Sequence, residues 1–456
     1  MGVTRTLARY AAETTYEDLP REVVEQTKVC ILNILGVAFG GFKTRIGQLH
    51  IKMAKDFGGG KPQATIIGDG SKVSAPLAAY ANGNLSFALD YEDMIHYILH
   101  PGYISVSSGL AIGESLKSSG KDFITAIALA YEVAGRIGLA MQPTLERGSQ
   151  VWGEQYTPFA GVVPAGKLLG LNEDQMDIAF GVTGTYATVP SVYKYFGIVK
   201  ETRPMKEVKI GWGWMCMASV FAALSAKEGF GGGYGVLDGE EGFWIMEGSD
   251  QCDFDKMTED LGKKYLIMDT EFKVHPSIGW VHPVHITTKD LVEENDIKPD
   301  DVKQVTVKGM MTNRLDDYNP AGPVDAMFSL PYTIATTILR EKLLPDMYSD
   351  EKIKDPKVQG LLKKIKCEPD PKADELWFDE LSLLFNIEIV LTDDRVINRS
   401  VQWPKDKPPF GKKEVEQKYR DLAELVVPAD RAEQILETVY NLENLNDISK
   451  LASMLY

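Results

Sequence analysis

The stretch DFITAIALAYEVAGRIGLAM, residues 122–141, decides the class of fold. Within Ile124–Met141 only Glu132 and Arg136 are charged, and the apolar residues cover nearly every side of a helix. A surface helix needs a polar face, so a helix that is apolar almost all round is expected to lie buried among other helices. The same stretch is too short and too charged to favour a membrane span. It therefore predicts a helical domain with this segment in its interior.

Similar helical patterns continue through the first half of the chain, where apolar residues recur at helical spacing. Gly170-Leu-Asn172, with acids directly after it, predicts the end of one helix and the start of the next. One short β-like run, Ala64–Gly68, interrupts the pattern. The other helices that we predict here span residues 20–40, 76–90, 104–118, 158–170, 173–187 and 205–228.

The pattern changes from about residue 266. Val302–Lys308 alternates apolar and polar residues, as a half-buried strand does. Leu381–Leu391 and Val396–Gln402 predict two more strands, joined in a hairpin by the turn between them. Four helices accompany these strands, two before the hairpin and two after a Pro/Lys-rich connector, and they are predicted at residues 324–341, 356–365, 412–425 and 429–441.

These patterns predict a mainly α protein with two domains. A large all-helical domain is built from both chain ends, residues 1–265 and 404–456. A smaller α+β lid domain, residues 266–403, is inserted late in the chain and has an ordinary domain size.

The composition limits the classes of function. The 456 residues carry a net charge of −16, which argues against nucleic acid or a membrane as a partner, because both attract basic surfaces. The four cysteines are far apart and form no CxxC pair, which argues against a disulfide framework, a zinc site or an iron–sulfur cluster. The N-terminus has no apolar signal region, so we expect a cytoplasmic protein.

Three acids and two histidines stand within eleven residues: Asp90, Glu92, Asp93, His96 and His100. Carboxylates and histidine together suit acid–base chemistry near neutral pH. Two alternatives remain open. One is a metal site that uses both histidines, although the HExxH order is absent. The other is a structural role in which both histidines are only hydrogen-bonded.

A basic segment at residues 194–214 contrasts with the acidic chain. Its proline suits the first turn of a helix, and Arg203, Lys206 and Lys209 recur every three residues. Cations beside the free N–H groups of a helix N-terminus favour carboxylate binding. A solvated basic face is the alternative, but the Gly-Trp-Gly-Trp run that follows indicates tight packing.

Half of the six histidines lie in residues 273–285, KVHPSIGWVHPVH, at the predicted domain boundary. Ligands commonly bind where domains meet. Lys273, His275 and His282 are therefore candidates for substrate binding, and a structural role is the alternative for each histidine.

These segments, in this order, resemble the motifs of the MmgE/PrpD family. Residues 90–93 with His100-Pro-Gly102 are similar to its pattern ALDYDD…HPG, and DAMFSLPY at 325–332 is similar to its EAxFSLPY segment. The likeness runs from end to end of the chain. The other similar segments are MKEVKIGWGW at 205–214, Lys273 with His282-Pro283, KLLGL at 167–171 and KYRDLA at 418–423.

The family includes 2-methylcitrate dehydratase, cis-aconitate decarboxylase and iminodisuccinate epimerase. The resemblance implies a homodimer without a cofactor or metal, with its active site between a helical domain and a lid. Its substrate would be a small anionic di- or tricarboxylate. The residues implied to line the site are Asp90, His100, Lys206, Lys273 and Tyr332.

Two positions depart from the family pattern. Met94 stands where the family often has threonine. Residues 150–158 lack the histidine that often precedes the Lys167 helix, and Glu154, Gln155 or Tyr156 is the candidate substitute.

The chemistry that the resemblance implies is movement of a proton next to a carboxylate. His100 would act as acid or base with Asp90 as its partner, and Tyr332 would donate a hydrogen bond or a proton. Lys206 is placed with these catalytic residues because a lysine there would stabilise developing carboxylate charge. The residues that we assign to substrate binding are Lys273, Lys209, Arg203, His96, Gln155, His275 and His282.

The leading hypothesis is a lyase: a 2-methylcitrate dehydratase-like or cis-aconitate decarboxylase-like enzyme. An isomerase or epimerase of an amino- or imino-dicarboxylic acid is the first alternative. The missing family histidine favours it, because a site with one base needs fewer catalytic groups. A non-catalytic small-acid binding protein of the same fold is the second.

Overall fold

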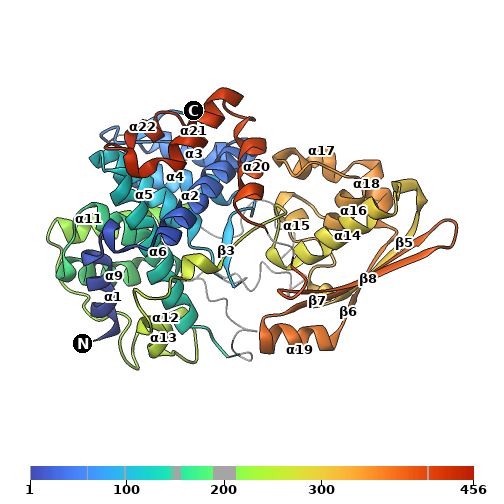
Figure 1. Ribbon diagram of the computed structural model, residues 1–456, viewed down its shortest axis with the longest axis horizontal. Coiled ribbons are helices and arrows are strands. Elements are labelled where there is room, and N and C mark those ends of the chain that lie inside the picture. Colours follow the sequence, from blue (N-terminus) through green and yellow to red (C-terminus); the bar gives the residue numbers. More distant parts are fainter. Residues whose placement is uncertain are drawn as a thin grey trace.

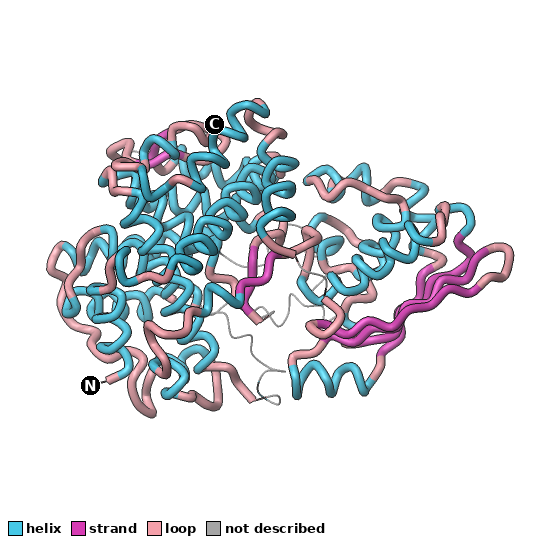
Figure 2. Tube along the Cα trace, in the orientation of Figure 1, coloured by secondary structure: helices cyan, strands magenta, loops and turns pink. Residues whose placement is uncertain are grey.

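The computed structural model describes residues 2–58, 60–96, 99–144, 147, 156–187, 212–407 and 410–456. Helices dominate, so the predicted mainly α class is confirmed. Figure 1 shows a large body of helices joined to a smaller part that carries the main sheet. Figure 2 shows the long strands gathered in that smaller part, while both chain termini lie in the helical body.

The buried stretch that opened the sequence forms helix α6 (Gly120–Ala140) in the middle of the helical body. Phe123, Ile127 and Tyr131 on this helix have no exposed surface. α6 packs on α8 (Thr157–Leu168), and its other neighbours include α5 and α2. The prediction of a helix buried among helices is confirmed.

Both ends of the chain contribute to this body. α2 (Arg21–Phe42) packs against α20 (Lys412–Ala423) from the far end of the chain, and α1 (Val3–Glu13) packs on α9 (Glu173–Tyr186). The remaining helices of the body are α3 (Arg45–Asp56), α4 (Ala75–Phe87), α5 (Gly102–Leu116), α11 (Trp212–Lys227), α12 (Phe243–Glu247), α13 (Phe254–Thr258), α21 (Ala429–Tyr440) and α22 (Ser449–Ala452).

α4 and α11 approach closely at Gly213. A Cβ atom there would lie 2.2 Å from the Tyr80 carbonyl oxygen and 2.0 Å from Asn84 Nδ2, so only glycine fits. The neighbouring Trp212 is buried with its ring centroid 4.3 Å from that of Phe87. The tight packing predicted from the Gly-Trp-Gly-Trp run is therefore present at Trp212 and Gly213, whereas Trp214 is 50% exposed.

Among the described helices, α2 and α6 are long and apolar enough to cross a membrane by length and composition. For α6 this differs from the prediction that its length and charges exclude a span. The most apolar windows of the two helices are 89% and 94% buried inside the fold. Core helices pass the same test, and burial on this scale is typical of them.

The main sheet has four strands in the order β6-β5-β7-β8. β5 (Val302–Gly309) pairs parallel with β6 (Ile365–Pro369) and antiparallel with β7 (Leu383–Leu391). β7 continues through a turn into antiparallel β8 (Val396–Trp403), so the predicted hairpin is confirmed. α14 (His282–Glu294) packs on β7 and β8.

Two predicted helices were wrong in their extent. The predicted helix 324–341 is divided into α15 (Pro323–Met327) and α16 (Leu330–Ile338), because the Ser329 side chain caps the second helix and a proline follows in its first turn. The predicted helix 356–365 ends earlier, since pairing with β5 draws residue 365 into β6. The other helices here are α17 (Asp350–Ile353), α18 (Pro356–Leu362) and α19 (Pro371–Glu380).

Two short ladders lie outside the main sheet. β1 (Ala64–Thr65) pairs with β2 (Lys72–Val73), which fits the predicted β-like run. β3 (Asp93–Ile95) pairs antiparallel with β4 (Thr270–Phe272). Figure 1 shows β3 where the helical body faces the sheet-bearing part. This second ladder brings the acidic segment that follows α4 beside residues 273–285.

Candidate active site

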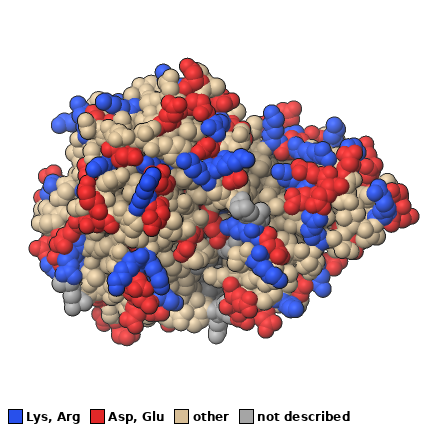
Figure 3. All heavy atoms as spheres, viewed as in Figure 1, with Lys and Arg blue, Asp and Glu red and all other residues tan. Residues whose placement is uncertain are grey.

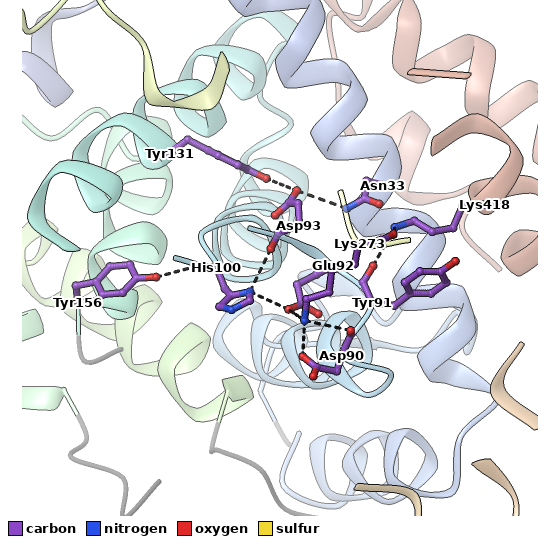
Figure 4. Close-up of polar contacts among 10 residues, drawn as sticks. All are labelled: Asn33, Asp90, Tyr91, Glu92, Asp93, His100, Tyr131, Tyr156, Lys273 and Lys418. Carbon is purple, nitrogen blue, oxygen red and sulfur yellow. Dashed lines mark hydrogen bonds and ion pairs between the residues drawn. The ribbon is translucent and has the colours of Figure 1, made fainter. Parts of the chain in front are cut away.

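A tight turn after α4 sets the direction of the acidic segment. α4 ends at Phe87, and Asp90 adopts a φ of 50°, in the left-handed region that few residues other than Gly, Asn and Asp accept. Such conformations persist only where the surroundings enforce them, and they cluster at functional sites. Here the turn places the Asp90 and Glu92 side chains on either side of Lys273 (Figure 4).

The ammonium group of Lys273 is held by two buried carboxylates. Its Nζ lies 2.6 Å from Asp90 Oδ1, 2.9 Å from Glu92 Oε1 and 3.1 Å from the Asp90 carbonyl oxygen. Burial opposes the charged lysine, but the two carboxylates outweigh it and raise the pKa of Lys273. Burial likewise opposes the ionised form of Glu92, yet Lys273 and the neighbouring histidine lower the pKa of Glu92.

His100 stands beside this group with one ring nitrogen engaged. Its Nδ1 lies 2.9 Å from Glu92 Oε1 and 3.2 Å from the Asp93 carbonyl oxygen, and its backbone N–H donates to the Tyr156 hydroxyl at 2.8 Å. Both neighbours of Nδ1 are acceptors, so Nδ1 carries a proton. Nε2 is then the atom that can take or give a proton. The edge of the Phe87 ring closes one side of the imidazole.

Asp93 provides a third buried carboxyl group, behind His100. Its Oδ2 accepts hydrogen bonds from the Tyr131 hydroxyl at 2.7 Å and from Asn33 Nδ2 at 3.5 Å. Burial raises the pKa of Asp93 to about 6, although the Tyr131 hydrogen bond acts in the opposite direction. This carboxyl group therefore changes charge close to neutral pH.

Lys418 reaches the same region from α20. Its Nζ donates to the carbonyl oxygens of Tyr91 at 2.9 Å and Lys273 at 3.2 Å, and it lies 4.2 Å from the centre of the Tyr91 ring (Figure 4). Burial lowers the pKa of Lys418 to about 7, although Asp93 and Glu92 partly oppose that shift. Acidic and basic groups from three distant segments thus meet in one buried cluster.

Several buried polar atoms here have no hydrogen-bond partner among the described residues. They are Glu92 Oε2, Asp93 Oδ1, His275 Nε2 and His282 Nε2. A buried polar atom left without a partner costs about 1–3 kcal/mol. Such atoms are suited to receive the polar groups of a ligand.

The predicted histidines of residues 273–285 are buried and uncharged. Burial lowers the pKa values of His275 and His282 well below normal, and the nearby charge of Lys273 adds to the effect at His282. His275 Nδ1 contacts the Ser277 hydroxyl at 2.8 Å, and its ring packs on His285. Neutral imidazoles can donate or accept hydrogen bonds but cannot attract a carboxylate by charge.

Two other predicted site residues lie in different surroundings. His96 is partly exposed, and its Nε2 is 3.7 Å from Asp269 Oδ2. Tyr332 is fully buried, donates its hydroxyl hydrogen to the Met347 carbonyl oxygen and stacks on Tyr348. Tyr348 in turn donates to the Pro276 carbonyl oxygen at 2.5 Å. The roles proposed for His96 and Tyr332 stay predictions.

The predicted carboxylate-binding residues Arg203, Lys206 and Lys209, together with Gln155, lie outside the described residues. The part of the chain that the structure describes holds no group of three or more His, Cys, Asp or Glu side chains arranged for a metal ion. The His96 side chain is 42% exposed and lies near Asp269, whereas the His100 side chain is 8% exposed and lies beside Glu92.

The sequence placed Glu92 and Asp93 in the candidate acid–base group but predicted no individual role for either of them or for Lys418. Glu92 had a signal, because it stands two residues from Asp90 and alternate residues of an extended segment share a side. The sequence also held a signal for Lys418, because it shares one face of its helix with the buried residues Val415 and Leu422. A lysine on an apolar helix face needs a polar partner inside the protein.

Comparison with known proteins identifies the family of this chain. Residues 5–252 match the MmgE/PrpD N-terminal domain and residues 275–444 match the MmgE/PrpD C-terminal domain. A cis-aconitate decarboxylase of Aspergillus terreus is 25% identical over 100% of this chain and 96% of its own length. The human protein named cis-aconitate decarboxylase is 24% identical over 96% of this chain and 91% of its own. Because the two domain matches together span most of the sequence, this chain belongs to the MmgE/PrpD family.

Proposed function

We propose that this protein is a carboxy-lyase that releases carbon dioxide from cis-aconitate or a closely similar tricarboxylate. The observation that carries the proposal is the buried group of His100, Glu92, Asp90 and Lys273, in which one imidazole nitrogen is anchored and the other can exchange a proton. Relatives named cis-aconitate decarboxylase, aligned over nearly the whole chain, favour decarboxylation over the other reactions of the family.

The reaction needs one proton and no redox step. The bond between a CH2 carbon and its carboxylate breaks, and carbon dioxide leaves. The electron pair of that bond forms a new double bond between the CH2 carbon and its neighbour. The electron pair of the original double bond moves to its far carbon, where a proton is added. The product is an unsaturated dicarboxylate. Charge spreads onto the remaining carboxylates as the bond breaks, so cationic groups there would lower the barrier.

His100 would deliver the proton from Nε2. Glu92 and the Asp93 carbonyl oxygen hold Nδ1 and so fix the orientation of the ring. General acids placed in this way typically contribute factors of about 10²–10⁴ to a rate.

Lys273 would act mainly by organising Asp90 and Glu92. Its ammonium group has contacts to three oxygens of these two residues, so it would meet a substrate carboxylate only by releasing one of them. We therefore assign most of the attraction for the substrate to the basic residues predicted at 203–209, and hydrogen bonding to the buried His275 and His282.

The test is to incubate the purified protein with cis-aconitate in D2O and follow the mixture by proton NMR together with carbon dioxide release. Equal amounts of carbon dioxide and a deuterated unsaturated dicarboxylate support the proposal. If cis-aconitate is unchanged while 2-methylcitrate or citrate loses water, the enzyme is a hydro-lyase instead. Deuterium exchange at the α-carbon of an amino- or imino-diacid, without net product, would identify an epimerase.

We also propose that the working form is a homodimer in the cytoplasm. Support for a dimer comes from α11, where Trp214 and Phe221, seven residues apart on one helix face, are 50% and 48% exposed. Aromatic side chains are enriched in protein interfaces. Figure 3 shows acidic and basic side chains intermixed over one face of the molecule.

A further inference from the structure

We propose that Lys418 is a positioning residue of this site: its ammonium group holds the segment that carries Asp90 and Glu92 against the segment that carries Lys273, directly after β4. The proposal rests on the proposed function for its kinetic readout only. The hydrogen bonds of Lys418 Nζ to the described residues go to backbone carbonyl oxygens, so it acts through the backbone of the residues that form the cluster.

The first support is the place where its hydrogen bonds fall. β3 and β4 end their pairing at Asp93 and Phe272, and one more backbone bond follows, from the Lys273 N–H to the Glu92 carbonyl oxygen at 3.2 Å. Lys418 Nζ then joins the next two carbonyl oxygens, those of Tyr91 and Lys273. A side-chain ammonium group thereby prolongs the connection between the two segments beyond the last bond of the ladder.

The second support is that these carbonyls belong to residues at the centre of the cluster. Tyr91 stands between Asp90 and Glu92, and the Lys273 carbonyl belongs to the lysine that both carboxylates contact. A change in the Tyr91 peptide would turn both carboxylates, because its neighbours share the backbone. Misplacement of catalytic groups by about 1 Å can cost a factor of 10² in rate.

The third support is the cost of placing a lysine here. Lys418 is 5% exposed, and both of the hydrogen-bond acceptors recorded for it are neutral carbonyls. The charged groups that affect it are Asp93 and Glu92, which favour its ammonium form, and Lys273, which opposes it; burial dominates and lowers its pKa to about 7. Ionisable groups held at such a cost concentrate at functional sites.

Lys28 provides a matched control within the chain. It is 1% exposed, and its Nζ also donates to a carbonyl oxygen, that of Tyr440, while it pairs with Glu25 and Glu443. Replacing either lysine with methionine keeps an unbranched side chain that is one atom shorter and removes its donors. Both changes are expected to lower the melting temperature, so loss of stability alone does not separate them.

The kinetic experiment compares Lys418→Met, Lys418→Arg and Lys28→Met with the wild type on cis-aconitate. We expect Lys418→Met to lower kcat about 10- to 100-fold with KM changed less than about threefold. Lys418→Arg should recover part of kcat because it keeps a cationic donor. Lys28→Met should keep kcat within about twofold of the wild type. Equal kcat values for Lys418→Met and Lys28→Met would overturn the proposal.

A second measurement is independent of the substrate. Hydrogen exchange of peptides that cover residues 90–95 and 270–274 should become faster in Lys418→Met and stay unchanged in Lys28→Met. If the wild type does not act on cis-aconitate, the proposed function fails, and this exchange comparison alone decides the role of Lys418. Unchanged exchange in both peptides of Lys418→Met would show that it does not hold the segments together.

Discussion

Lys273 Nζ and Asp90 Oδ1 lie 2.6 Å apart, and the two side chains are only 1% and 2% exposed. A buried ion pair gains stability only while both partners are present, because each alone is an uncompensated charge in a poorly solvated place. Glu92 adds a second negative charge on Lys273, so the three side chains carry a net charge of −1 if all are ionised. The cluster is therefore organised around the lysine.

The losses of stability caused by removing the two partners of this pair should not add. We expect Lys273→Met or Asp90→Asn alone to lower the free energy of unfolding by about 3–5 kcal/mol. The double variant should lose less than the sum of the single losses, because each single variant already removes the contact between Asp90 and Lys273 and the double variant loses it only once. Urea unfolding of the four proteins measures this coupling. Additive losses would contradict a direct interaction between the two groups.

His100 and His96 offer a comparison within one segment. His100→Gln removes the proton-exchanging Nε2 and should lower kcat by a factor of about 10²–10⁴. His96→Gln changes a side chain that is 42% exposed, and it should leave kcat within about threefold. Steady-state rates on the substrate found for the wild type provide the measurement. Similar losses in both variants would move the acid–base role away from His100.

Much of the fold could be predicted because its signals are local. The apolar periodicity of α6 and the alternation in β7 and β8 are properties of short segments, and each formed as expected. The failures came from tertiary contacts. Residue 365 joined a strand because β5 offered it a parallel partner, and pairing of that kind is not visible in a short window of sequence.

The candidate site was predicted in part for the same reason. Asp90 and His100 lie in one short motif, so both could be named from the sequence, but the carboxylate beside His100 Nδ1 is that of Glu92. The partners that fix their surroundings are distant in sequence: Lys273 is 183 residues from Asp90, and Lys418 is 327 residues from Tyr91. Only the folded structure shows that these two lysines contact the acidic segment. The sequence alone gives no local pattern that would predict contacts over such distances along the chain.

Asp93 should make stability depend on pH between about 4 and 6. Burial raises its pKa from 3.8 to about 6, so the folded protein holds this proton more tightly than the unfolded chain. Stability is therefore greatest below the unfolded pKa and falls as pH rises to about 6. The shift of about two units corresponds to about 3 kcal/mol at most.

Asp93→Asn removes that ionisation while preserving size and hydrogen-bonding atoms. Its free energy of unfolding should equal or exceed that of the wild type at pH 7, and the difference should shrink at pH 4.5. Urea unfolding at both pH values gives the measurement. A variant that is several kcal/mol less stable than the wild type at pH 7 would show that the ionised Asp93 is stabilising.

Tyr332 separates a structural contribution from a catalytic one. Its hydroxyl group donates to the Met347 carbonyl oxygen in a fully buried place. Tyr332→Phe should lower the free energy of unfolding by about 1 kcal/mol, the usual net value of one hydrogen bond, and keep kcat within a few-fold. Unfolding and rate measurements on the same preparation test both points. A fall in turnover by about two orders of magnitude would instead favour the catalytic role that the sequence predicts.

The apolar face of α11 should decide the assembly. Phe221 is 48% exposed there, whereas Val396 is 55% exposed at the start of β8 and serves as a control for a new surface charge. If a second copy covers Phe221, then Phe221→Glu buries an unpaired carboxylate in the interface and weakens association by several kcal/mol. Sedimentation should then give a dimer for the wild type and for Val396→Glu, and a monomer for Phe221→Glu. A dimer for all three proteins would place the interface elsewhere, and a monomeric wild type would refute the homodimer itself.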